Sequence, residues 1–148
     1  MKIAFPYGKG TVSYDFAGEN LLACAEAPLK SFRPGESGEE LIRKAMQDPE
    51  GSVRLSELAR GKKKIVVIIS DHTRPVPSKL ILPPMLREIR EGSPDADVTL
   101  LVATGCHRGT TEEELAAKCG REITEHEKIV IHDCDDRENL VSLGTLPP

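Results

Sequence analysis

The chain has 148 residues and a formal net charge of −4, from 20 basic and 24 acidic side chains. Because the charges fall in short mixed runs and only 3% of residues are aromatic, with no tryptophan, composition argues against a nucleic acid ligand and favours a small polar one. Its apolar runs are shorter than the ~20 residues of a membrane span and its first residues lack a signal-peptide pattern, so we expect a cytoplasmic protein without a membrane partner.

The first third of the chain predicts a hairpin, a connection and a helix. Residues 2–7 and 11–16 alternate apolar and polar side chains around a Gly-Lys-Gly turn, which is typical of two antiparallel strands. Residues 17–36 carry turn signals and predict a surface connection. A helix is expected over 37–48, since an apolar stripe follows a Ser-x-x-Glu capping sequence that begins at Ser37.

The rest of the chain alternates strands and helices. After a short helix that ends at Gly61, we expect strands at 65–69, 98–102 and 129–131, and helices at 78–91 and 111–119. Helical crossovers return a chain to start the next strand in the same direction, so the pattern predicts an α/β fold: a Rossmann-like parallel sheet flanked by helices, with an N-terminal β-hairpin. The strands are continuous apolar runs, which predicts that both sheet faces are covered.

The two crossover helices differ in how well the sequence defines them. Pro83 and Pro84 lie inside the first, which either begins near Leu82 with a proline in its first turn or begins earlier and is kinked there. The second has a capping box, Thr111 with Glu114, and Gly120 is expected to end it.

We expect residues 1–148 to form a single α/β domain, with a last small strand at 140–142. Parallel sheets with helical crossovers usually have more than three strands. The chain is therefore expected to be the N-terminal lobe of a longer two-domain enzyme, with the missing C-terminal domain as its partner.

Ionisable side chains follow the carboxyl ends of all three predicted parallel strands. These ends meet at one edge of a parallel sheet, where ligands bind. The loops that converge there are Asp71-His72-Thr73-Arg74-Pro75, Ala103-Thr104-Gly105-Cys106-His107-Arg108-Gly109 and His132-Asp133-Cys134-Asp135-Asp136.

Arg74 and His107 are the leading candidates at this edge. The guanidinium of Arg74 matches a carboxylate or phosphate bidentately; alternatively it pairs with Asp71 across a local turn. The imidazole of His107 can accept and return a proton near neutral pH; alternatively it only bonds the loop. His72 and His132 are weaker candidates, and His126 is expected to be solvated.

The helix that begins near Thr111 offers a further anion site through its free backbone N–H groups. No G-x-G-x-x-G or G-x-x-x-x-G-K-[ST] motif is present, which argues against a nucleotide-dependent dehydrogenase.

The cysteines Cys24, Cys106, Cys119 and Cys134 form no C-x-x-C pair, so we interpret them as thiols. A metal site built from Cys106, His107, His132 and Cys134 is the alternative.

Two motifs stand out at the ends of the first two parallel strands: S-D-H-T-R-P at 70–75, followed by V-P-S-K at 76–79, and A-T-G-C-H-R at 103–108. Together they resemble motifs of a known family, the nickel-pincer lactate racemases and their relatives that act on other 2-hydroxy acids. The resemblance covers roughly residues 40 to 145.

The resemblance implies a role for three residues. Asp71 and Arg74 would bind the substrate, with Arg74 holding its carboxylate, and His107 would be one of two histidines that move the hydroxyl proton while hydride passes to and from the cofactor. The substrate would be a small 2-hydroxy acid.

The family's nickel-pincer nucleotide is tethered to a lysine in a glycine-rich segment that this sequence lacks, as it lacks the nickel-binding histidines. None of the cofactor is therefore expected to bind this chain, and the chain alone is expected to be inactive. The alternative function is a non-catalytic module that binds a small carboxylate or phosphate.

Overall fold

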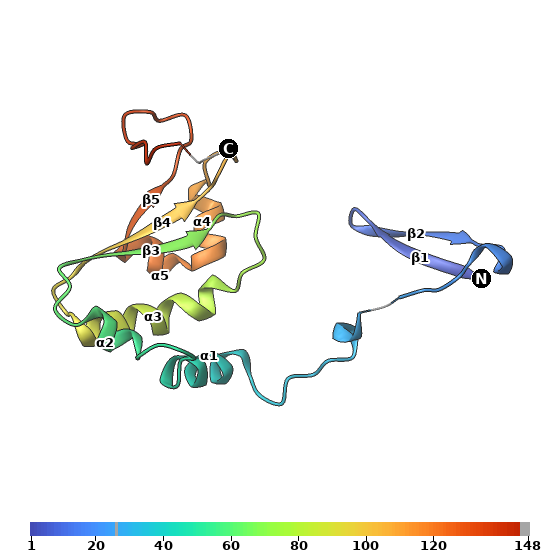
Figure 1. Ribbon diagram of the computed structural model, residues 1–148, viewed down its shortest axis with the longest axis horizontal. Coiled ribbons are helices and arrows are strands. Elements are labelled where there is room, and N and C mark those ends of the chain that lie inside the picture. Colours follow the sequence, from blue (N-terminus) through green and yellow to red (C-terminus); the bar gives the residue numbers. More distant parts are fainter. Residues whose placement is uncertain (26, 146–148) are drawn as a thin grey trace. The chain divides into compact units, whose positions relative to one another are not determined.

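The computed structural model describes residues 1–25 and 27–145, and the chain groups into two compact units, Met1–Gly35 and Glu36–Pro148. The first unit holds an antiparallel hairpin of β1 (Lys2–Tyr7) and β2 (Gly10–Asp15), as the alternating pattern predicts (Figure 1). Gly8 has a φ of 57° at the turn, a conformation that glycine adopts without steric cost. Two short 3-10 turns follow, η1 (Gly18–Asn20) and η2 (Pro28–Lys30).

The second unit contains a parallel sheet and five helices in its described residues. In chain order they are α1 (Gly38–Gln47), α2 (Leu55–Ala59), β3 (Lys64–Ser70), α3 (Ser78–Gly92), β4 (Asp97–Ala103), α4 (Glu112–Cys119), α5 (Arg121–His126) and β5 (Lys128–Ile131). The strands pair in the order β3-β4-β5, all parallel (Figure 1). The predicted α/β class, a parallel sheet flanked by helices with an N-terminal hairpin, is confirmed.

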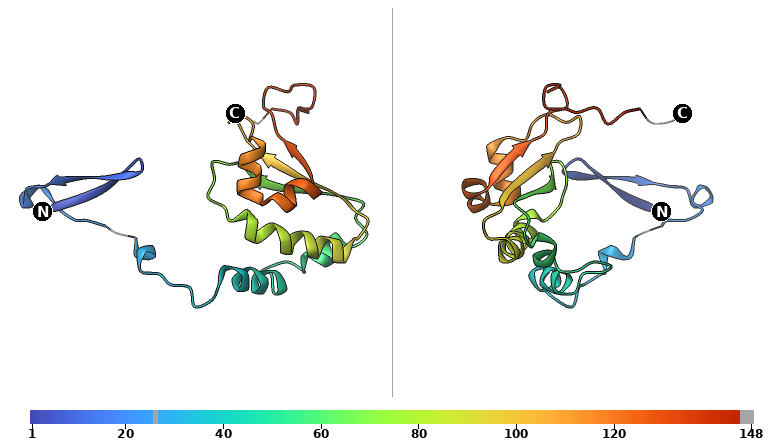
Figure 2. Two further views of the ribbon diagram at one scale, coloured as in Figure 1. Left: turned by 180° about the vertical axis from the view of Figure 1, so that it is seen from behind. Right: turned by 60° about the vertical axis from the view of Figure 1, so that its left-hand side comes forward.

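The apolar core lies on one face of this sheet. Alternate residues of the central strand, Val98, Leu100 and Val102, are buried against α3, α4 and α5, which lie on the same side of the strands (Figure 2). On the other face, Val66 and Ile68 of β3 are 59% and 70% exposed. The prediction that helices cover both faces is therefore wrong for the described part of this unit, since an apolar run does not specify what covers it.

Helix α3 contains both prolines and begins at Ser78, as in the second alternative above. The missing N–H groups of Pro83 and Pro84 would have bonded the carbonyls of Lys79 and Leu80. Both of those residues are exposed, so water can reach the freed carbonyls and the helix continues.

The helix caps agree with the prediction, whereas one short helix and one predicted strand differ from it. Ser37 Oγ accepts from the Glu40 N–H at 3.2 Å, and the box of Thr111 with Glu114 is complete. Helix α5 was not predicted, because it is six residues long and buries only Ile123. The prediction of a strand at 140–142 is wrong, because these residues have no regular structure.

No helix within the described ranges is long and apolar enough to cross a bilayer.

Candidate functional site

The loop after β3 is organised around the Asp71 carboxylate. Asp71 is 1% exposed, and its Oδ1 accepts from the backbone N–H of Thr73 at 3.2 Å and from the Thr73 hydroxyl at 2.7 Å. Such a bond from residue i to the backbone of i+2 forms an Asx turn, which short acidic side chains favour. The turn fixes the direction of the second carboxylate oxygen.

The loop after β4 brings His107 to that oxygen. Ser70 and Ala103 pair at the ends of the neighbouring parallel strands, so both loops start side by side. Gly105, with a φ of 60°, then reverses the chain, and the His107 N–H donates to the Thr104 carbonyl at 3.0 Å. The result is a distance of 2.5 Å from His107 Nδ1 to Asp71 Oδ2.

The pair has a defined protonation pattern. The hydrogen bond from His107, reinforced by those from Thr73, holds the pKa of Asp71 well below its ordinary value, so the carboxylate is ionised at neutral pH. An ionised carboxylate only accepts, so His107 Nδ1 carries the proton that it donates. In the neutral imidazole this leaves Nε2 as a proton acceptor, and the His107 side chain is 44% exposed.

Arg74 lines the same cavity as this pair. The cavity has a volume of about 460 Å³, and its polar lining includes Ser70, Asp71, Arg74, Thr104 and His107. Within the described residues the Arg74 guanidinium has no hydrogen bond or ion pair, and only the Arg74 backbone N–H bonds the Asp71 carbonyl. A side-chain pair between Arg74 and Asp71 is therefore absent there. The Ser70 hydroxyl at the same place is buried and has no partner in the part of the chain that the structure describes. Its described lining thus offers one cation, one proton acceptor and one unbonded hydroxyl, since the Thr104 hydroxyl already donates to the His132 carbonyl.

The other predicted histidines have separate partners. His132 Nδ1 lies 3.0 Å from the Thr104 hydroxyl, which itself donates to the His132 carbonyl at 2.6 Å. His72 Nδ1 lies 3.1 Å from the Thr110 hydroxyl. His126 is exposed at the end of α5, as expected.

The four side chains considered as a metal site do not form one within the described residues. All four cysteines are free thiols, as predicted. The group of three ligating side chains whose donor atoms lie within 4.8 Å of one another is instead Asp133, Cys134 and Asp135. Burial, reinforced by nearby carboxylates, raises the pKa of the Cys134 thiol, which disfavours the thiolate that a metal needs. Two carboxylates and a protonated thiol do not fit a histidine-rich nickel site.

The start of α4 does not provide the expected anion site. Glu114 accepts from the Thr111 N–H at 2.9 Å and pairs with Arg108 at 2.6 and 2.9 Å, and two more glutamates stand in the first turn. The hydrogen bonds from Arg108 lower the pKa of Glu114 to about 2, so it is charged at neutral pH. This acidic, self-capped turn disfavours an anion, and that prediction is wrong.

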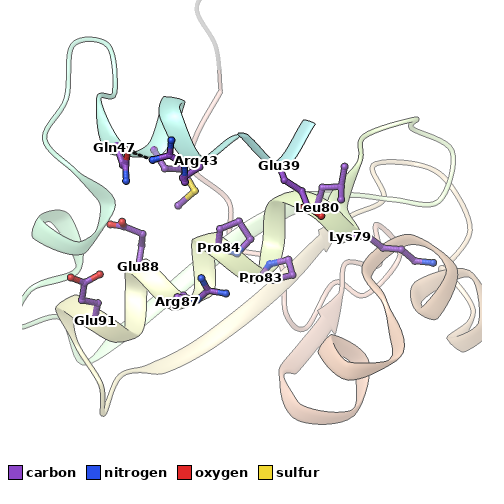
Figure 3. A pocket seen from close by; sticks show the side chains of 11 residues that line it. Glu39, Arg43, Gln47, Lys79, Leu80, Pro83, Pro84, Arg87, Glu88 and Glu91 are labelled. Carbon is purple, nitrogen blue, oxygen red and sulfur yellow. Dashed lines mark hydrogen bonds between the residues drawn. The ribbon is translucent and has the colours of Figure 1, made fainter. Parts of the chain in front are cut away.

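A larger cavity, of about 550 Å³, lies between α1 and α3 (Figure 3). Two of its charged residues already have partners: Arg43 bonds Glu40 and Gln47, and Glu88 pairs with Arg54. It contains no histidine, so we place the chemistry at the Asp71 cavity instead.

Sequence reasoning missed Thr73, Thr104 and Ser70 as parts of the site. The D-x-T spacing is a signal for the Asx turn and points to Thr73. No local pattern marks Thr104, because its partner, His132, comes from a different strand.

The chain is similar to proteins of one family. Residues 7–148 match the family described as the lactate racemase N-terminal domain. Over 145 residues, the chain is 44% identical to the lactate racemase of Thermoanaerobacterium thermosaccharolyticum and 43% identical to that of Lactiplantibacillus plantarum. The alignments cover 98% of this chain and 34% of each relative, so the chain spans about a third of their length.

Two solved structures are similar to this chain. The structure of the lactate racemase apoprotein from T. thermosaccharolyticum matches 99% of this chain and 34% of its own, with a TM-score of 0.84 and 44% identity. A crystal structure of a protein from Thermotoga maritima matches 74% of this chain and 24% of its own, with a TM-score of 0.57 and 28% identity. On the extent of the family match and the site geometry together, this chain belongs to the lactate racemase N-terminal domain family.

Proposed function

We propose that the chain belongs to a 2-hydroxy-acid racemase or epimerase of lactate type. In that enzyme it would be the part that binds the substrate and transfers the proton of the substrate hydroxyl. One observation carries this: Arg74, whose guanidinium has no partner among the described residues, lines the same cavity as His107, whose imidazole is oriented by the Asp71 carboxylate. The similarity to two lactate racemases supports the substrate class.

Each side chain has one task. The Arg74 guanidinium binds the substrate carboxylate through two parallel hydrogen bonds. His107 Nε2 accepts the proton of the 2-hydroxyl as it becomes a carbonyl, and returns it in the reverse step. Asp71 is a positioning residue: its oxygens are occupied by Thr73 and His107, so it orients the imidazole and stabilises the imidazolium.

The hydrogen on the substrate carbon must leave as a hydride, and its acceptor is not among these side chains. We propose that the parent enzyme is nickel-dependent, as the family resemblance implies, and that the nickel-pincer nucleotide is held by parts outside this chain. The described residues do not fit that group. The chain alone is therefore expected to show no racemase turnover. We place the parent enzyme in the cytoplasm because all four cysteines are thiols.

The test is made in the parent enzyme with the cofactor loaded, by following lactate enantiomers with a chiral assay. His107→Gln should lower kcat at least about 100-fold with little change in KM, because general base catalysis is lost while the carboxylate contact remains. Arg74→Met should raise KM about tenfold or more, and Arg74→Lys should restore part of that loss.

Asp71→Asn tests whether Asp71 positions His107 and does not bind the substrate. This variant should lower kcat and leave KM unchanged. It should also abolish the Nδ1-protonated form of His107, which imidazole ¹⁵N chemical shifts report. Unchanged kcat in His107→Gln would contradict the proposal and leave a module that only binds a small anion. Lys63→Ala, at an exposed position outside the cavity, is the control.

A further inference from the structure

Two of the free cysteines, Cys106 and Cys134, lie in neighbouring loops. Strands β4 and β5 pair in parallel, so the loops that follow them leave the sheet side by side (Figure 1). The His132 N–H donates to the Val102 carbonyl at 3.0 Å, and the Thr104 hydroxyl donates to the His132 carbonyl at 2.6 Å. These bonds hold the two loops together, and each cysteine stands two residues beyond the joined pair of Thr104 and His132.

The two thiols share one cavity. Cys106 and Cys134 both line a space of about 520 Å³, whose lining also includes His107. Burial raises the pKa of the Cys134 thiol, and the charges of Asp135, Cys106 and Asp133 add to this effect. A contribution from Cys106 requires the two sulfur groups to be near neighbours, because the interaction between charges weakens with distance.

Neither cysteine of this pair belongs to a helix or a strand. Both lie in turns, and Cys106 follows Gly105, whose φ is 60°. A disulfide needs its two sulfurs in bonding contact, and loops without a backbone ladder can move to allow it. The other two thiols are placed differently: Cys119 is 1% exposed in the apolar core, and Cys24 belongs to the first unit.

The loop that carries Cys106 also carries His107, and it has a neighbour on each side. Strand β4 lies between β3 and β5, so Asp71 and Cys134 come from opposite sides of this loop. His107 Nδ1 lies 2.5 Å from Asp71 Oδ2 on one side. A covalent bond from Cys106 to Cys134 on the other side would draw the loop toward β5 and lengthen the contact with Asp71.

We propose that Cys106 and Cys134 form a redox-active pair, which a small disulfide such as glutathione disulfide oxidises to an intramolecular disulfide. The exposed Cys106, as its thiolate, attacks glutathione disulfide, which forms a mixed disulfide and releases one glutathione thiolate. Cys134 then loses its proton and attacks the Cys106 sulfur, which releases the second glutathione. Two protein thiols thereby lose two protons and two electrons, and glutathione disulfide gains them to become two glutathione thiols. The proposal depends on this pair alone and not on the racemase assignment.

The experiment incubates the folded 148-residue chain with glutathione disulfide, blocks the remaining thiols with N-ethylmaleimide and maps tryptic peptides by mass spectrometry. Trypsin separates Cys106 from Cys134, because it cuts after Arg108 and Lys128. We expect one cross-linked pair of these peptides, lighter than their reduced sum by two hydrogen atoms and released by dithiothreitol. Cys106→Ser and Cys134→Ser should each lose the cross-link completely, and the matched control Cys24→Ser should retain it.

The second readout is the imidazole ¹⁵N signal of His107. It should shift on oxidation, shift equally in Cys24→Ser and return when dithiothreitol is added. Circular dichroism first checks that each reduced variant is folded, and the peptide map of the unaltered chain tests the pair whether or not a variant folds.

Three results would overturn the proposal: a mixed disulfide that stays on Cys106 without a cross-link, a cross-link that includes Cys24 or Cys119, or a His107 signal that does not respond to oxidation. His107→Gln should still form the disulfide. The thiol pair and the proposed catalytic function can therefore fail independently.

Discussion

At the residue scale, the site depends on how Asp71 is held. Three donors from two loops converge on its carboxylate, two from Thr73 and one from His107. A charge that is 1% exposed is stable only because these bonds replace water. The same bonds lower the pKa of Asp71, so one arrangement accounts for both its burial and its ionisation.

Glu114 allows a pH prediction at the same scale. Its pKa is lowered from 4.5 to about 2, so between these values the folded chain binds fewer protons than the unfolded chain. The stabilisation from Glu114 is therefore complete above pH 4.5 and is lost as the pH falls toward 2.

Glu114→Gln should make the free energy of unfolding, measured by urea titration at several pH values, less dependent on pH within that window. Glu113→Gln, on the exposed side of the same turn, should leave the wild-type dependence unchanged. Identical pH profiles for wild type and Glu114→Gln would contradict the assignment.

At the element scale, parallel pairing makes the site. β3 and β4 run in register from Lys64 opposite Asp97 to Ser70 opposite Ala103, so their loops leave the sheet together. The predicted convergence of Asp71, Arg74 and His107 follows from this register, and all three line one cavity.

Gly92 allows a prediction at the same scale. A Cβ at this last residue of α3 would lie 1.9 Å from the Ser56 carbonyl oxygen, so only glycine permits the observed packing of α2 on α3. In an unpacked helix Gly→Ala stabilises by roughly 1 kcal/mol. Here Gly92→Ala should instead lower the free energy of unfolding by about 1–3 kcal/mol, because the backbones of α2 and α3 must move apart.

Urea unfolding midpoints test this. Gly38→Ala is the matched control, since a Cβ there would make ordinary contact with Leu80 at 3.5 Å. A higher midpoint for Gly92→Ala than for wild type would exclude the close approach.

At the scale of the whole molecule, the core belongs to the second unit. The buried apolar residues of the described chain run from Ala59 to Ile123. A chain of residues 36–148 should therefore fold alone, with a thermal midpoint within about 5 °C of the intact chain, the shift that roughly 1 kcal/mol produces. Circular dichroism melting measures this, and loss of a cooperative transition would contradict it.

The sequence by itself determined the alternation of strands and helices, the helix caps and the residues that follow each strand, because periodicity, capping and turn chemistry are local. It named Asp71, Arg74 and His107 for the same reason. Only the tertiary structure decided that Val66 and Ile68 are exposed on one face of the described sheet, that α4 caps itself with Glu114, and that Thr104 bonds His132. These depend on contacts between segments far apart in the chain, which no local pattern encodes.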